Sequence, residues 1–295
     1  MHPLIESLVK DGPAVTDGSW GTQMQKRGLK RGQNPDSWNL THADQVREVA
    51  AHYVDAGSQI ILTNTFGASR LSLANFDLAD KTVDINMSGV RISKEAASDR
   101  ACVFASIGPT GKMMITGETT AEELQKVFEE QASAQAEAGA DGIIIETMID
   151  IEEARIAAIA AKQTGLPVIV SMVYDSGEDK DHTMMGNSPE EVVAEISKIG
   201  VDGIGANCGQ GIEAFLPICR RLRQATDLPI WIKPNAGLPE VVDDGVVFRT
   251  TPRDFVRYVP DLIQAGANFI GGCCGTDQEF VKAIRQTVEG MSRTE

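Results

Sequence analysis

The sequence lacks the features that would point to a membrane or nucleic-acid protein. No uncharged apolar stretch reaches the roughly 18 to 20 residues that a membrane-spanning helix needs. The N-terminal segment contains acidic residues and no long apolar core, so it does not resemble a secretory signal. Basic residues are outnumbered, with 27 Lys and Arg against 42 Asp and Glu. Because such a chain would be repelled by phosphate backbones and anionic membranes, we expect a cytoplasmic protein with neither nucleic acid nor membrane as partner.

Cysteine and histidine are also scarce. The 295 residues include five cysteines and four histidines. An odd number of cysteines in a chain without a signal fits a reducing compartment, where thiols serve as metal ligands or nucleophiles more often than as disulfides. The four histidines form no ligand-like set that would compete with the cysteines.

What the chain does have is a repeated apolar pattern. Four segments share it: AGSQIILTNT at 56–65, AGADGIIIET at 138–147, IGVDGIGANC at 199–208 and AGANFIGGCC at 265–274. In each, a glycine that can end a helix precedes a short turn and an apolar or glycine-rich run that suits a buried strand. Further apolar runs predict four more strands, at 14–18, 102–108, 167–174 and 230–237.

Helix starts are marked by a hydroxyl residue with an acid three positions later, sometimes with proline between them. This signature occurs at Thr120, Ser188, Thr251 and Thr276.

Eight alternating strand and helix units predict an α/β fold, a single-domain (β/α)8 TIM barrel over residues 1–295. Polar loops are expected at 175–183 and 239–247. A doubly wound sheet is less well supported, because the first strand is not followed by the Gly-x-Gly-x-x-Gly turn of a dinucleotide site.

Sulfur-bearing residues end two of the predicted strands. Catalytic residues of such barrels gather at the C-terminal ends of the strands. Cys208 ends the sixth strand, and the pair Cys273 and Cys274 ends the eighth. The fold therefore predicts three sulfurs on one rim, although about 65 residues separate Cys208 from the pair in sequence.

The cysteine pair lies between glycines in the motif GGCCGT. Successive residues of a regular strand point to opposite faces, which would keep Cys273 and Cys274 from sharing a ligand. Gly271, Gly272 and Gly275 permit backbone angles that other residues avoid. We therefore expect the chain to turn here and direct both sulfurs inward.

Three converging thiolates suit Zn²⁺, which takes sulfur ligands in a tetrahedron and keeps one position open in catalytic sites. Such a site has a net negative charge, so it activates water poorly and is better suited to keeping a substrate thiol nucleophilic. Buried cysteines are also common as small hydrophobic residues, and we assign Cys102 and Cys219 to packing.

The motifs GGCCGT and GANCG resemble those of the homocysteine S-methyltransferase family. TDGSWGTQ, ILTNTFGA, IGPTG, GIIIET and KPNAG occur in the order of that family, and the resemblance extends over essentially the whole chain. Within the family, the sequence looks most like the homocysteine-binding barrel of cobalamin-dependent methionine synthase. The resemblance implies a zinc enzyme that transfers a methyl group to the sulfur of homocysteine to form methionine.

The resemblance also implies roles for individual residues. Cys208, Cys273 and Cys274 would be the catalytic cysteines and hold one Zn²⁺ per chain. Asn235 would complete the metal shell when substrate is absent. Glu146 would hold the substrate ammonium.

Further substrate contacts are expected at the ends of the first and third strands. Asp17 matches a polar position of the family's first strand end. Backbone N–H groups near Gly18, Thr22 and Gly108 could bind the substrate carboxylate as a small anion nest.

Two residues depart from the family pattern at the substrate end. Trp20 is bulkier than the residue expected there, and Met148 stands where a phenylalanine-containing variant is usual. These departures leave the zinc chemistry intact. They bear on which thiol is the acceptor and which methyl donor reacts.

Several donors remain open. Because a methyl on a neutral amine or on folate has a poor leaving group, the donor should be a sulfonium such as S-methylmethionine, a betaine, or methylcobalamin. The chain ends at Glu295 without room for a cobalamin domain, so we expect methylcobalamin to act only through a separate corrinoid protein.

Two other functions are weighed against methyl transfer. A zinc hydrolase on the same barrel would need His or carboxylate ligands at several strand ends, and these are missing. A zinc barrel that acts on a different thiol, or serves as a non-catalytic partner subunit of a corrinoid system, would carry zinc without consuming homocysteine.

Overall fold

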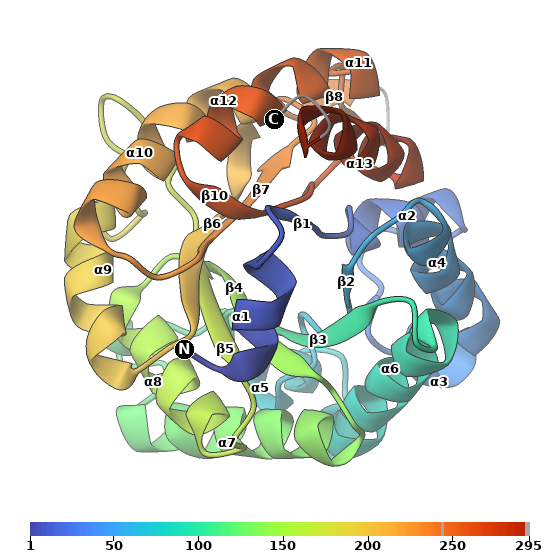
Figure 1. The fold of residues 1–295 in the computed structure, drawn as a ribbon. Coiled ribbons are helices and arrows are strands. Elements are labelled where there is room, and N and C mark those ends of the chain that lie inside the picture. Colours follow the sequence, from blue (N-terminus) through green and yellow to red (C-terminus); the bar gives the residue numbers. More distant parts are fainter. Residues whose placement is uncertain (243–244, 293–295) are drawn as a thin grey trace.

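In the computed structural model of the protein, which describes residues 1–242 and 245–292, eight parallel strands form a barrel (Figure 1). The strands are β1 (Ala14–Val15), β2 (Ile60–Leu62), β3 (Cys102–Ile107), β4 (Gly142–Met148), β5 (Val168–Met172), β6 (Gly203–Gly211), β7 (Ile230–Asn235) and β10 (Ala267–Ile270). They pair in the order β1-β10-β7-β6-β5-β4-β3-β2, and a parallel bridge between Thr16 and Ile60 joins the two ends. The predicted (β/α)8 barrel is confirmed, with all eight predicted strands present. The domain span 1–295 stays a prediction, because residues 293–295 lie outside the described part.

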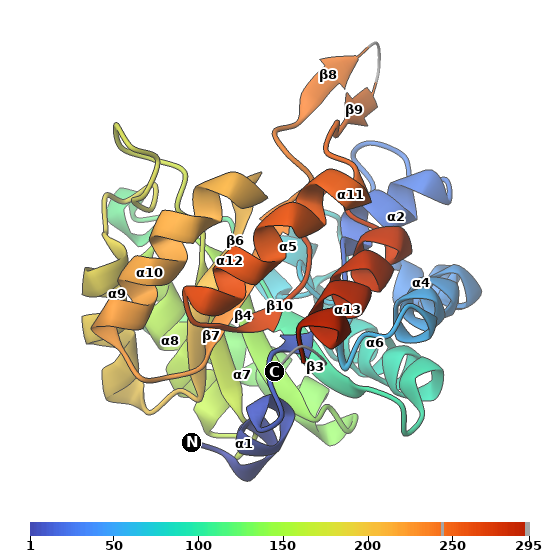
Figure 2. The same cartoon turned by 45° about the horizontal axis from the view of Figure 1, so that its top comes forward.

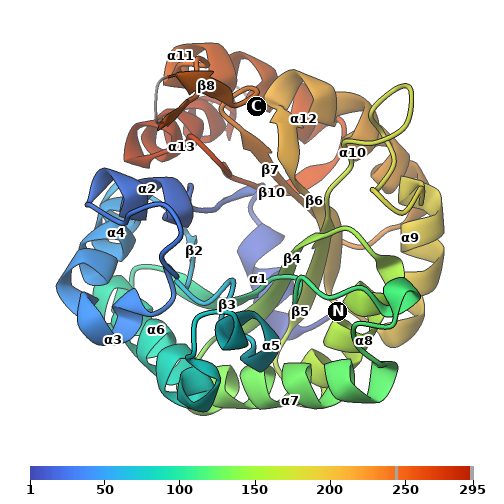
Figure 3. The same ribbon diagram turned by 180° about the vertical axis from the view of Figure 1, so that it is seen from behind.

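Helices form a ring around the barrel. They are α2 (Trp20–Lys26), α3 (Trp38–Thr41), α4 (Ala43–Asp55), α5 (Arg70–Ala74), α6 (Thr82–Ala97), α7 (Ala121–Glu137), α8 (Ile151–Lys162), α9 (Pro189–Ile196), α10 (Phe215–Ala225), α11 (Pro252–Phe255), α12 (Val259–Gln264) and α13 (Gln278–Ser292). A further helix, α1 (Pro3–Val9), crosses the N-terminal end of the barrel, and Figure 3 views the molecule from the opposite end. No helix in the described ranges has the length and continuous hydrophobicity needed to cross a membrane.

Three of the four predicted helix caps are confirmed. Thr120, Ser188 and Thr251 each accept a hydrogen bond from the backbone N–H three residues later, and Ser188 forms a full capping box with Glu191. The fourth start is wrong by one residue. The side chain of Asp277 accepts the Glu279 N–H at the start of α13, because the Thr276 hydroxyl is used elsewhere.

The lower half of the barrel interior is apolar. Alternate residues of each strand point inward, and those nearest the N-terminal end pack together beneath α1. Together with Ile5 of α1, the strand residues of this layer are Ala14, Ile60, Leu62, Phe104, Ile144, Ile169, Trp231 and Phe269. Phe104 stacks on Trp231, with ring centroids 6.5 Å apart.

Polar side chains replace the apolar ones at the next inward position of several strands. Two residues after the core positions of β3, β4, β5 and β7 come Ser106, Glu146, Ser171 and Lys233. All four are buried. The barrel therefore has a closed apolar floor and a polar layer near its C-terminal mouth, where function is expected.

The predicted loop at 239–247 contains a hairpin. Strands β8 (Glu240–Val242) and β9 (Gly245–Val247) pair antiparallel on either side of residues 243–244, which lie outside the described residues. Figure 2 shows the two strands projecting beyond the barrel. The polar-loop prediction is therefore wrong here, because the adjacent valines at 241–242 and 246–247 are β-branched residues that favour strands.

Candidate active site

The three cysteines predicted from the strand ends converge. Their sulfur atoms all lie within 4.8 Å of one another, and those of Cys208 and Cys274 are 3.9 Å apart. Sulfurs around a tetrahedral Zn²⁺, bound at about 2.3 Å, would be about 3.8 Å apart. Among the described residues, no other group of three His, Cys, Asp or Glu ligands is this close. The donor set and its spacing fit a zinc ion.

Cys208 reaches the cluster through an irregular stretch of β6. Pairing with β7 shifts between Asn207 and Gly211, and Cys208 has a φ of 64°. A left-handed φ is costly for a residue with a Cβ and persists where the surroundings enforce it, often at functional sites. The backbone is thus bent at the residue whose sulfur must leave the plane of the sheet.

The glycines beside the cysteine pair act partly as predicted. Gly275 has a φ of 83°, which provides the expected turn. Gly271 and Gly272 are not left-handed; they are required by close packing. A Cβ at Gly271 would lie 2.0 Å from the Thr16 hydroxyl oxygen, and one at Gly272 would lie 2.4 Å from that of Thr276. The end of β10 therefore lies close against β1 and the following turn.

Hydrogen bonds fix the backbone of the pair. The Cys273 N–H donates to the Pro234 carbonyl at 2.7 Å, and the Thr276 hydroxyl donates to the Cys273 carbonyl at 2.7 Å. The Cys274 N–H donates to Asn235 Oδ1 at 3.0 Å. Asn235 thus lies at the cluster and orients Cys274, while its predicted place in the metal shell stays a prediction.

The three thiols influence one another's protonation strongly. Hydrogen bonds from Cys273 and Cys274 lower the pKa of Cys208 to about 3. Because Cys273 and Cys274 donate these hydrogen bonds to the Cys208 thiolate, they lose their protons less readily. The pKa of Cys274 rises to about 12, and that of Cys273 rises well above its usual value. One negative charge forms easily and further ones repel each other. A cation at the centre would relieve that repulsion.

The cysteines open into a cavity of about 460 Å³ at the mouth of the barrel. This volume is typical of small-molecule sites. Polar groups at its inner end include Ser106, Glu146 and Lys233, and large rings at its outer part include Trp20 and Phe66. The arrangement suits a ligand with a polar head and a sulfur.

Glu146 lies at the polar end and is 8% exposed. Its Oε1 accepts a 2.6 Å hydrogen bond from the Ser106 hydroxyl. Burial raises the pKa of Glu146, and the ammonium of Lys233 opposes that shift. No hydrogen bond from the described residues engages Oε2, so this oxygen is left for a ligand.

Lys233 is a charged residue of the cavity that the sequence alone did not reveal. It is 2% exposed, lines the cavity and forms an ion pair with Asp17. The available signal was a lysine two residues after Trp231 in an otherwise apolar strand. That spacing places the ammonium on the inward face, one layer above the core.

Of the other four residues predicted to contact substrate, two line the cavity and two do not. Gly18 and Thr22 line the cavity, although the Thr22 N–H already donates to Ser19 Oγ. Gly108 does not line it, and its N–H donates to the Phe66 carbonyl at 2.9 Å, so the expected anion contact there has no free donor. Asp17 is fully buried beneath the cavity wall.

Asp17 has other partners. Its Oδ2 accepts hydrogen bonds from Trp20 Nε1 at 2.8 Å and the Leu62 N–H at 2.7 Å, and its Oδ1 accepts from Lys233. Direct contact with substrate stays a prediction. The structure gives Asp17 the role of anchoring two side chains of the cavity.

The other residues that the sequence singled out differ in burial. Trp20 lines the cavity, whereas Met148 is fully buried and does not. Cys219 is fully buried in the helix layer, and Cys102 packs near the floor of the barrel, as expected for packing residues.

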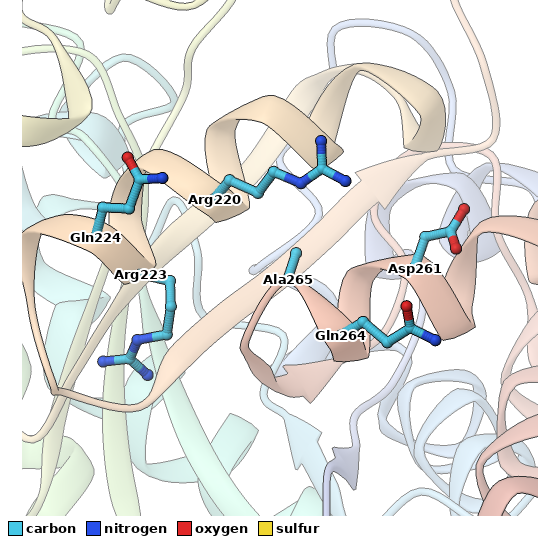
Figure 4. Close-up of a pocket in the computed structure, with 6 residues that line it drawn as sticks. All are labelled: Arg220, Arg223, Gln224, Asp261, Gln264 and Ala265. Carbon is cyan, nitrogen blue, oxygen red and sulfur yellow. The ribbon is translucent and has the colours of Figure 1, made fainter.

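A separate hollow lies on the outside of the barrel between α10 and α12 (Figure 4). Its lining consists of Arg220, Arg223, Gln224, Asp261, Gln264 and Ala265. It contains none of the predicted site residues.

Comparison with known proteins gives one consistent relationship. A family model described as homocysteine S-methyltransferase matches residues 14–288. Methionine synthase from Mycobacterium leprae is 28% identical over 306 residues, which cover 97% of this chain and 25% of that protein. Methionine synthase from Mycobacterium tuberculosis is 27% identical over 302 residues, covering 95% and 25%. The chain therefore spans about a quarter of the length of these curated relatives.

Solved structures agree on the fold. The homocysteine methyltransferase MmuM from Escherichia coli, in its metallated form, has a TM-score of 0.81 at 23% identity, covering 97% of this chain and 99% of that one. Its oxidised form also gives a TM-score of 0.81, at 22% identity. At this level of identity the likeness shows a shared barrel.

Proposed function

Because the chain belongs to the homocysteine S-methyltransferase family, we propose that it transfers a methyl group to the thiol of homocysteine and forms methionine. The observation that carries the proposal is the cluster of three cysteine sulfurs within 4.8 Å of one another, opening into a cavity with a buried carboxylate at its polar end.

We assign Cys208, Cys273 and Cys274 as the ligands of one Zn²⁺. Bound there, zinc would lower the pKa of an acceptor thiol and keep its sulfur nucleophilic at neutral pH. The sulfur spacing supports this assignment, as does the structural likeness to a metallated homocysteine methyltransferase. We also assign Asn235 as the fourth ligand before substrate binds, an assignment supported by the hydrogen bond between its Oδ1 and the Cys274 N–H.

The protein's own residues bind and orient the acceptor. Glu146 has a free carboxylate oxygen that can accept a hydrogen bond from the substrate ammonium, while Ser106 holds its other oxygen. Fixing the amino-acid end in this way directs the sulfur toward the cysteine cluster and reduces the entropy cost of methyl transfer. Trp20 and Phe66 form apolar walls that limit the access of water.

The donor is proposed at a coarser level than the acceptor. The similarity to methionine synthases supports a methyl-corrinoid protein that docks at the mouth of the barrel. S-methylmethionine and a betaine remain alternatives, because a sulfonium or quaternary ammonium carries a methyl that a thiolate can displace directly.

The proposal is tested by incubating the zinc-loaded protein with homocysteine and each donor in turn, and following methionine by mass spectrometry. We expect methionine from at least one donor, little from Cys208→Ala, and wild-type yields from Cys219→Ala, which changes a buried cysteine remote from the cavity lining. Equal yields from the two variants would contradict the assignment of Cys208. A zinc-loaded protein that makes no methionine with any donor would favour a non-catalytic barrel or a different thiol.

A further inference from the structure

We propose that Lys233 is a second substrate-binding residue, which pairs with the carboxylate of the acceptor thiol. The inference deepens the proposed function and rests on it. It divides recognition of an amino-acid thiol between two side chains: Glu146 for the ammonium and Lys233 for the carboxylate.

The first argument is the unused hydrogen-bonding capacity of Lys233. Its Nζ lines the cavity, and within the described residues it donates one hydrogen bond, to Asp17. An ammonium has three donors. Burying a charged group with donors unmet is costly, so a cavity-facing lysine of this kind is suited to an anionic ligand group.

The second argument is that Asp17 does not depend on Lys233 alone. Asp17 already accepts two hydrogen bonds, from Trp20 Nε1 and the Leu62 N–H. These two bonds engage Oδ2, so Lys233 is needed at Oδ1 alone. Lys233 therefore serves as the counter-ion of Asp17 with one donor, and its other donors remain for a group bound in the cavity that it lines.

The third argument is charge balance at the polar end of the cavity. Two carboxylates, Asp17 and Glu146, face the single ammonium of Lys233. The zwitterionic head group of an amino-acid thiol adds no net charge to the cavity. Its ammonium would pair with Glu146, and its carboxylate would pair with Lys233. The ring of Trp231, 5.7 Å below Nζ, supports the ammonium from the core side.

The test uses three thiols that differ only at the head group. Homocysteine has both charged groups, 4-mercaptobutyrate lacks the amine, and 3-aminopropane-1-thiol lacks the carboxylate. Binding of each to the zinc-loaded protein is measured by isothermal titration calorimetry, without any methyl donor. We expect wild-type protein to bind homocysteine roughly 10- to 100-fold more tightly than 3-aminopropane-1-thiol.

The variant is the pair Asp17→Asn with Lys233→Met, which removes both charges together and avoids leaving a buried carboxylate unpaired. We expect it to bind homocysteine and 3-aminopropane-1-thiol with equal affinity, so that the ratio of the two dissociation constants falls from roughly 10- to 100-fold to about one. A variant that keeps the preference for the carboxylate would overturn the proposal and leave Lys233 as a counter-ion of Asp17. A wild-type protein without that preference would overturn it without any variant.

These outcomes are separate from the fate of the proposed function. Carboxylate-dependent binding without methionine formation would contradict the enzyme and support Lys233. Methionine formation without carboxylate preference would contradict Lys233 alone.

Discussion

Replacing Glu146 by Gln tests whether the buried carboxylate holds the substrate. The substitution preserves the shape of the side chain. In the wild type the Ser106 hydroxyl donates to Oε1 at 2.6 Å; in the variant the amide NH2 can donate to Ser106 Oγ, which leaves the amide oxygen in the place of Oε2. What is lost is the negative charge at the polar end of the cavity. The fold should therefore be retained while the affinity for homocysteine falls.

The size of the loss follows from the site. A hydrogen bond to a charged group contributes about 1.5–3 kcal/mol, against about 0.5–1.5 kcal/mol for a neutral one. Exchanging one for the other costs about 1–2 kcal/mol, which is roughly a 5- to 30-fold increase in Kd. The binding of 4-mercaptobutyrate, which has no ammonium, should not weaken.

The same residue gives a pH dependence with a defined sign. Only the ionised carboxylate attracts an ammonium, and burial raises the pKa of Glu146 above its ordinary value of 4.5. Homocysteine affinity should therefore fall as the pH is lowered, starting at a higher pH than for an exposed glutamate, and Glu146→Gln should remove this dependence.

Isothermal titration calorimetry on the zinc-loaded protein measures both effects. Glu153→Gln is the matched control, because Glu153 is also a buried glutamate with a raised pKa but contacts Thr110 and does not line the cavity. If Glu146→Gln binds homocysteine as tightly as the wild type, the assignment of Glu146 to the ammonium is refuted.

Two further predictions concern packing and stability. Gly272→Ala should destabilise the fold by about 1–3 kcal/mol and lower the zinc content, because the new Cβ would lie 2.4 Å from the Thr276 hydroxyl oxygen. Gly290→Ala is the control, because a Cβ at Gly290 would have no atom within 4 Å, and it should change neither property. Thermal melts and metal analysis measure the two effects. Asp36, buried against the cavity, has its pKa raised from 3.8 to about 7, mainly by desolvation. Since the folded state then holds a proton that the unfolded state releases, its contribution makes stability fall as the pH rises from about 4 to about 7, by at most about 4 kcal/mol. Urea unfolding at pH 5 and pH 8 checks this, and a curve for Asp36→Asn as steep as that of the wild type would contradict it.

The barrel could be predicted because each of its signals is local. A glycine before an apolar run, or a hydroxyl three residues before an acid, fixes a turn or a helix start within a few positions. The errors arose where tertiary contacts intervene. Thr276 has the composition of a cap, but its hydroxyl is used by the Cys273 carbonyl, so the neighbouring Asp277 caps α13.

The site residues also differ in whether local sequence signals or tertiary contacts identify them. Cys208 and the cysteine pair could be identified from strand ends and neighbouring glycines. Lys233 could not be identified in this way, because its role depends on Asp17, which follows β1, and on Glu146 in β4. Only the closed barrel brings these residues together. The N–H of Gly108 is used by the Phe66 carbonyl, a loop contact that no sequence pattern indicates, and a substrate contact at Gly108 stays a prediction.

The central claim is that three cysteines hold a zinc ion whose open position accepts the sulfur of homocysteine. X-ray absorption at the zinc edge, on protein with and without homocysteine, tests it most directly. The account predicts three sulfur ligands and one nitrogen or oxygen ligand in the free protein, and four sulfur ligands after homocysteine is added. Fewer than three sulfurs in the free protein, or a sulfur count that homocysteine leaves unchanged, would contradict it.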